Sequence, residues 1–191
     1  LGRGGRTILV NGVAAQGTLE VARRTLLRFV NAANGRFFNL SLPGYEFLVV
    51  GTDGGRYAEP LVKRELLLVP GERIDAYVVP AAGTTSNASV VDLSTLAYDR
   101  GHGSAAEPVR LVSRVKVTGD EDARSYPRSV TPIPRFSSPS SFSITLGEAK
   151  SNPGLPPALT LNGESWPNIT PIRVPLGTTW EYDVVNETSA P

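Results

Sequence analysis

Apolar and polar residues alternate with a period of two along most of this 191-residue chain. Such alternation turns one face of an extended segment toward a core and the other toward solvent, so it predicts β-strands. We expect strands at residues 25–30, 36–42, 45–52, 61–69 and 73–79. Turn formers separate them, at Asn31–Gly35, Pro43-Gly44, Asp53-Gly-Gly55 and Pro70-Gly71. Turn signals at this spacing, without sustained helical periodicity, predict an all-β antiparallel sandwich or barrel.

The pattern loosens after the fifth predicted strand. Residues 81–106 are rich in Gly, Ser, Thr and Ala, around one apolar island at 90–96. Residues 109–117 alternate again, apolar at odd positions, which predicts a strand with one buried face, the last of its sheet. The stretch 119–141 contains Pro127, Pro132, Pro134 and Pro139 and many serines. Proline cannot donate to a sheet ladder, so we expect an extended interdomain linker there.

Two landmarks of the first half recur in the second. An apolar strand runs into Asn-Gly at Thr7–Gly12 and again at Ala158–Gly163. A later strand ends in Val-Asn at Asn31 and again at Asn186. Asn-Gly supplies the positive φ angles of a tight turn, and the shared order of landmarks predicts two related domains in tandem. We therefore expect a complete domain at 1–118, a linker at 119–141 and the first part of a second domain, incomplete, at 142–191.

Composition narrows the function classes. The formal charge is +1, from 19 basic and 18 acidic side chains, which provides no field for nucleic acid or an anionic membrane. Cysteine is absent, so disulfides and thiolate chemistry are excluded. No apolar run is long enough to span a membrane, and the N-terminus has no signal-peptide core. Methionine is absent even at position 1, so a processed, trimmed or partial chain is expected.

The same blocks carry a family resemblance. The segment Leu26-Leu-Arg-Phe-Val-Asn-Ala-Ala-Asn-Gly-Arg-Phe-Phe-Asn-Leu-Ser-Leu-Pro43 resembles the central domain of three-domain multicopper oxidases of the bacterial laccase type. Val50–Gly55 and Glu65–Asp75 are similar to the continuation of that domain, and Thr7–Gly12 resembles its entry. The likeness is densest over 6–79 and resumes at 142–191. It implies cupredoxin-like Greek-key β-sandwiches, here the middle domain and the start of the third.

The resemblance also implies a function. The complete parent would oxidise phenols, aromatic amines or metal ions one electron at a time, at type 1 and trinuclear copper sites, and reduce dioxygen to water. This chain would be its non-catalytic scaffold, with no copper of its own, partnered by the missing first domain and the remainder of the third. Periplasmic or extracellular location is expected by resemblance. The alternative is a copper-free relative that acts as a structural or cell-division protein in the periplasm.

No residue stands out as catalytic, cofactor-binding or metal-binding. The single histidine, His102, lies in a glycine-flanked segment, and one imidazole cannot form a copper centre. Asp53–Gly55 is expected to be a turn rather than a phosphate loop, because no helix is predicted after it. Glu72 and Asp75 are expected to face solvent or to hold Arg73 rather than to act as an acid pair.

Aromatic and asparagine side chains complete the candidates. Trp166 and Trp180 are expected to pack in the core of the second sandwich rather than to stack on a substrate. Four asparagines head Asn-x-Ser/Thr sequons, and we treat these sequons as weak signals: Asn39, Asn87, Asn168 and Asn186.

Overall fold

The computed structural model describes residues 5–14, 17–23, 25–84, 90–100, 106–119, 140–150 and 157–188. Contacts divide the chain into two compact units, whose boundary falls within the predicted linker rather than at either end of it. Most of the predicted linker, residues 120–139, lies outside the described residues, so the proposed domain boundaries stay a prediction. No α-helix occurs in the described part of the chain, and none of it forms a helix that could cross a membrane.

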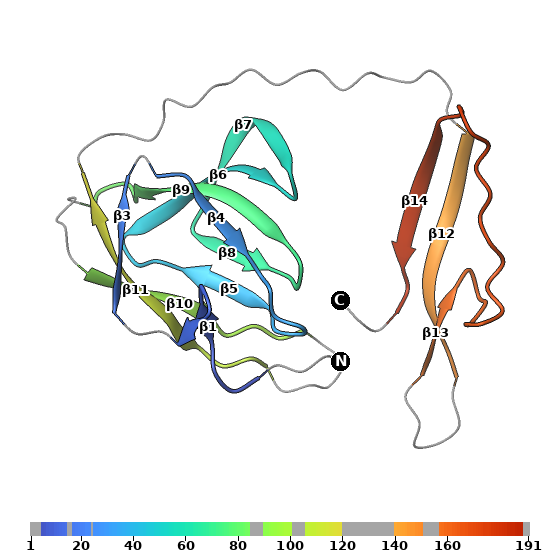
Figure 1. The fold of residues 1–191 in the computed structure, drawn as a ribbon, viewed down its shortest axis with the longest axis horizontal. Coiled ribbons are helices and arrows are strands. Elements are labelled where there is room, and N and C mark those ends of the chain that lie inside the picture. Colours follow the sequence, from blue (N-terminus) through green and yellow to red (C-terminus); the bar gives the residue numbers. More distant parts are fainter. Residues whose placement is uncertain are drawn as a thin grey trace. The chain divides into compact units, whose positions relative to one another are not determined.

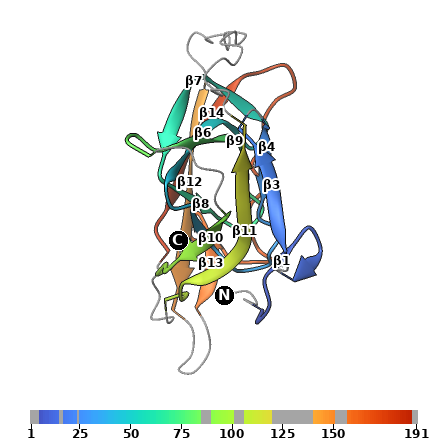
Figure 2. The same ribbon diagram turned by 90° about the vertical axis from the view of Figure 1, so that its left-hand side faces the viewer.

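Two sheets face each other in the first unit (Figures 1 and 2). The five-stranded sheet has the order β3 (Thr18–Ala22), β11 (Arg110–Thr118), β10 (Val90–Leu96), β5 (Phe38–Ser41) and β8 (Glu65–Leu68). The four-stranded sheet has the order β4 (Leu27–Val30), β9 (Arg73–Pro80), β6 (Tyr45–Thr52) and β7 (Gly55–Lys63). A small hairpin of β1 (Leu9–Val10) and β2 (Val13–Ala14) stands apart from both sheets. Neighbours that are distant in sequence make this a sandwich with Greek-key connections.

The core lies between the two sheets and follows the alternation of the strands. In β9, Ile74, Ala76 and Val78 face inward and are at most 5% exposed. Phe47 on the neighbouring strand β6 is 1% exposed and meets Phe29 of β4 edge-to-face, with the ring centroids 5.8 Å apart. Burial of this apolar surface is the main favourable term that holds the sheets together.

Most predicted strands are present, with informative differences. The predictions at 45–52 and 73–79 are confirmed by β6 and β9. The prediction at 61–69 is wrong as a single strand, because the chain changes sheet at Arg64: β7 ends at Lys63 and β8 begins at Glu65. The apolar island at 90–96 is the strand β10, and β3 has no counterpart among the expected strands.

The prediction that the odd-numbered residues of 109–117 are buried is only half correct. Val115 and Val117 are buried as expected, but Val109 and Leu111 are 59% and 42% exposed, while Val112 is buried. A register shift against β10 at Leu93 and Ser94 explains this change, since a β-bulge moves the following side chains to the opposite face. β11 is the last strand of its sheet along the described chain, but it lies between β3 and β10 and pairs with β3 in parallel.

The second unit is a three-stranded sheet with the order β13 (Ala158–Leu161), β12 (Ser140–Ala149) and β14 (Trp180–Asn186). β12 pairs in parallel with β14 and antiparallel with β13. The strand registers place the apolar side chains on one face, which we call the apolar face: Phe142, Ile144, Leu146, Leu159, Leu161, Tyr182 and Val184. The opposite face carries mainly Ser, Thr, Glu and Asp side chains.

The repeated sequence landmarks adopt the same local structure in both units. Asn11-Gly12 has φ angles of 51° and 83°, and Asn162-Gly163 has 51° and 82°, so both form the predicted positive-φ turn. Asn31 Oδ1 accepts a hydrogen bond from the Ala33 amide at 3.0 Å, and Asn186 Oδ1 accepts one from the Thr188 amide at 3.1 Å. The amide side chains therefore turn the chain in the same way after both strands.

Gly51 is required by a close backbone approach in the β6–β7 hairpin. A Cβ atom at this position would lie 2.2 Å from the carbonyl oxygen of Gly55. Because backbone atoms cannot rotate away, we expect Gly51→Ala to destabilise the first unit by about 2 kcal/mol or more. The free energy of unfolding, measured by urea titration with circular dichroism, checks this value.

Gly55→Ala in the same hairpin is the matched control. Its Cβ would meet nothing closer than 3.4 Å, an ordinary contact. We expect a change within about 0.5 kcal/mol. Equal unfolding free energies for the two variants would contradict the role given to Gly51.

Candidate functional site

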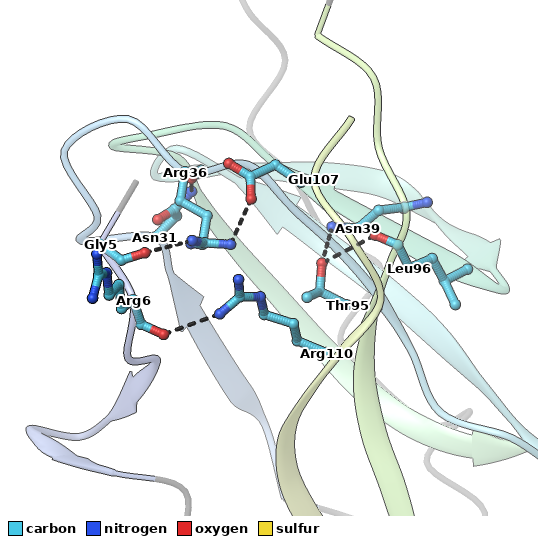
Figure 3. Close-up of polar contacts among 9 residues, drawn as sticks. All are labelled: Gly5, Arg6, Asn31, Arg36, Asn39, Thr95, Leu96, Glu107 and Arg110. Carbon is cyan, nitrogen blue, oxygen red and sulfur yellow. Dashed lines mark hydrogen bonds and ion pairs between the residues drawn. The ribbon is translucent and has the colours of Figure 1, made fainter. Parts of the chain in front are cut away.

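A cluster of buried polar contacts lies at one end of the first unit, around Arg36 (Figure 3). Arg36 follows the turn Asn34-Gly35 and precedes β5, and only 5% of it is exposed. Its Nη1 lies 2.6 Å from Glu107 Oε2, and its Nη2 donates to the carbonyl oxygen of Gly5 at 2.8 Å. A buried guanidinium requires such partners, because an unpaired charge in an apolar region is costly.

Asn31, at the end of β4, joins several segments beside this arginine. Its Nδ2 donates to the carbonyl oxygens of Arg36 at 2.8 Å and of Leu68 at 3.0 Å. Its backbone amide donates to the carbonyl oxygen of Glu72, and its own carbonyl accepts from Gly71. The side chain is therefore fully used in holding backbone, and the sequence signal for it was the Val-Asn landmark rather than any catalytic pattern.

The partner carboxylate is fixed from the other side. Glu107 and Tyr98 exchange two backbone hydrogen bonds of 2.8 and 3.1 Å, and the Tyr98 ring stacks on Phe37 at 5.6 Å. Arg110 Nη1 donates to the carbonyl oxygen of Arg6 at 3.0 Å. Two arginines thus fasten residues 5–6 to the end of the sandwich. This cluster could not be predicted from the sequence, since Arg36 and Glu107 are 71 residues apart and no motif links them.

Asp53–Gly55 is a turn, as predicted. Asp53 and Gly54 have φ angles of 50° and 92°, and they connect β6 to β7. Asp53 is also the partner of Arg73, with 3.2 Å between Arg73 Nη1 and Asp53 Oδ1. Of the two expected settings for Glu72 and Asp75, a contact with Arg73 is replaced by this pair with Asp53, and both carboxylates are partly exposed to solvent.

Glu72 and Asp75 do not form an acid pair. Glu72 Oε2 accepts a hydrogen bond from the Val69 amide at 2.8 Å. Asp75 pairs with Arg28 on the neighbouring strand at 3.3 Å. Each carboxylate therefore serves a separate local contact.

The two tryptophans differ from each other. Trp166 is 84% exposed, so the expectation of core packing is wrong for it. Trp180 is partly buried on the same side of the second sheet as the apolar face, and its Nε1 donates to Thr178 Oγ1 at 2.9 Å. The sequence could not separate them, because Trp166 lies in a turn whose direction depends on its surroundings.

The loop between β13 and β14 is closed by Glu164. Its carboxylate accepts hydrogen bonds from the Thr170 backbone amide at 2.5 Å and from the Thr170 hydroxyl at 2.9 Å. These bonds favour the ionised form and lower the pKa of Glu164 below the usual value of a glutamate, the backbone bond contributing most. Because the pKa of Glu164 is lowered by folding, the contribution of this contact to stability is present above the usual glutamate pKa. This contribution is lost as the pH falls through the folded-state pKa.

The sequons lie in different settings. Asn39 on β5 donates from Nδ2 to Glu65 at 2.7 Å. Asn168 is exposed in a turn, and Asn186 makes the contacts described above. His102 and Asn87 lie outside the described residues.

The donors of this chain do not fit a copper centre. Copper requires several imidazole or thiolate ligands that converge on one point, and the whole sequence contains one histidine and no cysteine. Among the described residues, no three His, Cys, Asp or Glu side chains are grouped so that they could hold a metal ion. That no site residue lies in this chain stays a prediction.

Comparison with known proteins identifies what the chain is similar to. The family model for multicopper oxidases matches residues 2–94. Multicopper oxidase LPR2 of Arabidopsis thaliana is 27% identical over 190 residues, which cover 96% of this chain and 32% of that protein. Cell division protein FtsP of Xenorhabdus nematophila is 36% identical over 117 residues, which cover 60% of this chain and 24% of that protein. The chain thus spans about a third or less of the length of these relatives.

A solved structure matches the fold. A multicopper oxidase from Campylobacter jejuni, described as a metallo-oxidase, superimposes with a TM-score of 0.81 at 22% identity. The match covers 98% of this chain and 42% of the other. The expected all-β, cupredoxin-like sandwich fold is confirmed.

The buried ion pair makes a measurable prediction. In Glu107→Ala, the guanidinium of Arg36 stays buried without its charge partner, so we expect the first unit to lose on the order of 3 kcal/mol of stability. Urea unfolding measures this loss. Glu20→Ala is the control, because Glu20 forms a similarly short pair of 2.9 Å with Lys116 at an exposed site. We expect a loss of about 0–1 kcal/mol there, and comparable losses in both variants would contradict the assignment.

The identification rests on independent features. The sequence blocks that carry the resemblance form strands β4 to β9 and the turns between them. The family model covers these strands, and the structural likeness extends through both units. The chain belongs to the multicopper oxidase family.

Proposed function

We propose that this chain is scaffold of a multicopper oxidase. The complete protein would couple one-electron oxidation of phenols, aromatic amines or metal ions to reduction of dioxygen to water. Copper, at type 1 and trinuclear sites, would be held by residues outside this chain. The donor set supports this division, since one histidine and no cysteine cannot form even one such centre.

One observation carries the scaffold role: the second unit has an exposed apolar face. Tyr182 and Val184 on β14 are 43% and 57% exposed, and Leu159 on β13 is 68% exposed. The opposite face carries mainly polar side chains, so the pattern matches a sheet that packs against further structure. In this proposal, the sheet packs its apolar face against other segments of the complete protein.

The proposed partners follow from that face. They are the first domain and the remainder of the third domain of the parent, in the same polypeptide or as a separate chain. Neither nucleic acid nor a membrane span is part of the proposal. We infer a periplasmic or extracellular location from the family.

A second candidate function is a copper-free interaction protein in the periplasm. The similarity to FtsP favours it, because that cell division protein is 36% identical to this chain over 117 residues. The coding sequence that follows position 191 separates the candidates. A His-x-x-His-x-His run there supports the oxidase, and its absence supports the interaction protein.

The purified chain is expected to hold no stoichiometric copper. The chain has one histidine and no cysteine. Incubation with copper salts followed by dialysis should therefore leave no blue absorbance at about 600 nm. Elemental analysis and an assay of phenol oxidation measure this. One bound copper per chain with oxidase activity would overturn the scaffold proposal.

The apolar face is expected to be where the remainder of the second sandwich binds. Val184→Lys places a charge on this face and should weaken co-purification with the polypeptide that carries the rest of that sandwich at least tenfold, because the lysine would be buried unpaired. Asp183→Lys, on the opposite face of the same strand, should leave co-purification within twofold. Equal effects of the two substitutions would contradict the assignment of the face.

A further inference from the structure

An apolar cavity of about 270 Å³ lies inside the first unit. It is bordered by the β1–β2 hairpin and by β3 and β4, the outermost strands of the two sheets on that side. Ile8 and Val10 of the hairpin region pack against the core beside it. The contacts of Arg36 and Arg110 with the backbone of residues 5–6 hold the chain that leads into this hairpin (Figure 3).

The cavity is deep as well as open. Its lining reaches Phe47, Leu42 and Val78, which are only 1–2% exposed. Its rim includes Leu19 and Val30, which are 39% and 59% exposed. A molecule that enters from solvent would therefore lie against the most buried side chains of the sandwich.

The polar groups at the cavity are already used elsewhere. The side-chain amide of Asn31 donates to the carbonyl oxygens of Arg36 and Leu68 and accepts from the Ala33 amide. Arg28 directs its guanidinium to Asp75, 3.3 Å away, and that side chain is 75% exposed. No charged partner for a ligand is therefore offered by these residues, and the remaining lining is apolar apart from Asn11 in the hairpin turn.

The size and the rings define the ligand class. An enclosed apolar cavity of about 150 Å³ can bind benzene, and this cavity, which opens to solvent, is larger. Phe29 and Phe47 already meet edge-to-face in its wall, and Phe38 lines it as well. Aromatic rings pack favourably in this arrangement.

We propose that this cavity is a binding site for a small, uncharged aromatic molecule of one or two rings. The site is separate from the scaffold role and independent of copper. Rings that enter beneath the β1–β2 hairpin would complete the packing around Phe29, Phe38 and Phe47. A carboxylate on the ring would be disfavoured, because Arg28, the cation in the cavity lining, is exposed to solvent and paired with Asp75, so it would not compensate a buried charge.

Benzene, indole and benzoate are the probes, titrated into the full chain and followed by amide and methyl NMR shifts. Benzene and indole should produce saturable shifts at Phe29, Phe38 and Val78, and benzoate should bind at least tenfold more weakly. Leu19→Trp should fill the rim and weaken indole binding at least tenfold. Val30→Trp, on the other sheet, is the second filling variant in case the first does not fold.

Leu67→Trp is the matched control, because Leu67 is 37% exposed on the edge strand β8 and does not line the cavity. It should leave the affinity within twofold. The proposal fails if the wild-type chain shows no saturable shifts, if the shifts map to the apolar face of the second unit, or if a second copy of the chain occupies the cavity as a concentration-dependent dimer. Each of these outcomes is independent of the copper measurements that test the scaffold role.

Discussion

An amphipathic sheet is stable when its apolar face is covered, and the described strands of the two units differ in how far this face is covered. In the first unit, β6 and β9 turn Phe47 and Val78 toward a second sheet, and both side chains are almost fully buried. In the second unit, β12 and β14 align Phe142 with Tyr182 and Ile144 with Val184, yet Tyr182 and Val184 keep much of their surface exposed. The first unit therefore contains its own core, whereas the described strands of the second leave their apolar face partly exposed.

Closure of the first sandwich also depends on buried polar groups. The end of a sandwich is where chains change sheets, and backbone groups there have no ladder partner. Asn31 supplies partners for the backbone of Arg36 and Leu68, and Arg36 supplies one for Gly5. Glu107 neutralises the guanidinium that makes this possible. Loss of Glu107 would remove the carboxylate from a buried guanidinium, and loss of the Asn31 amide would remove the bonds to the carbonyl oxygens of Arg36 and Leu68.

Local patterns were predictable from the sequence, and long-range ones were not. Asn11-Gly12, Asp53-Gly54 and Asn162-Gly163 are turns because their backbone preference acts within a few residues. Strands β6 and β9 were predicted for the same reason. The switch of sheets at Arg64 and the bulge near Val112 depend on neighbours distant in the chain, so alternation alone assigned the wrong face to Leu111.

The candidate site also depends on contacts between distant segments, which sequence patterns cannot predict. That one histidine cannot form a copper centre follows from composition alone, but the Arg36–Glu107 pair and the cavity exist only once separate segments meet. Apolar packing and these polar contacts hold the described part of the sandwich together. The core of the first unit contains a cavity beside the β1–β2 hairpin, where the two sheets end in β3 and β4. That open side of the sandwich is the place that the proposed aromatic ligand would occupy.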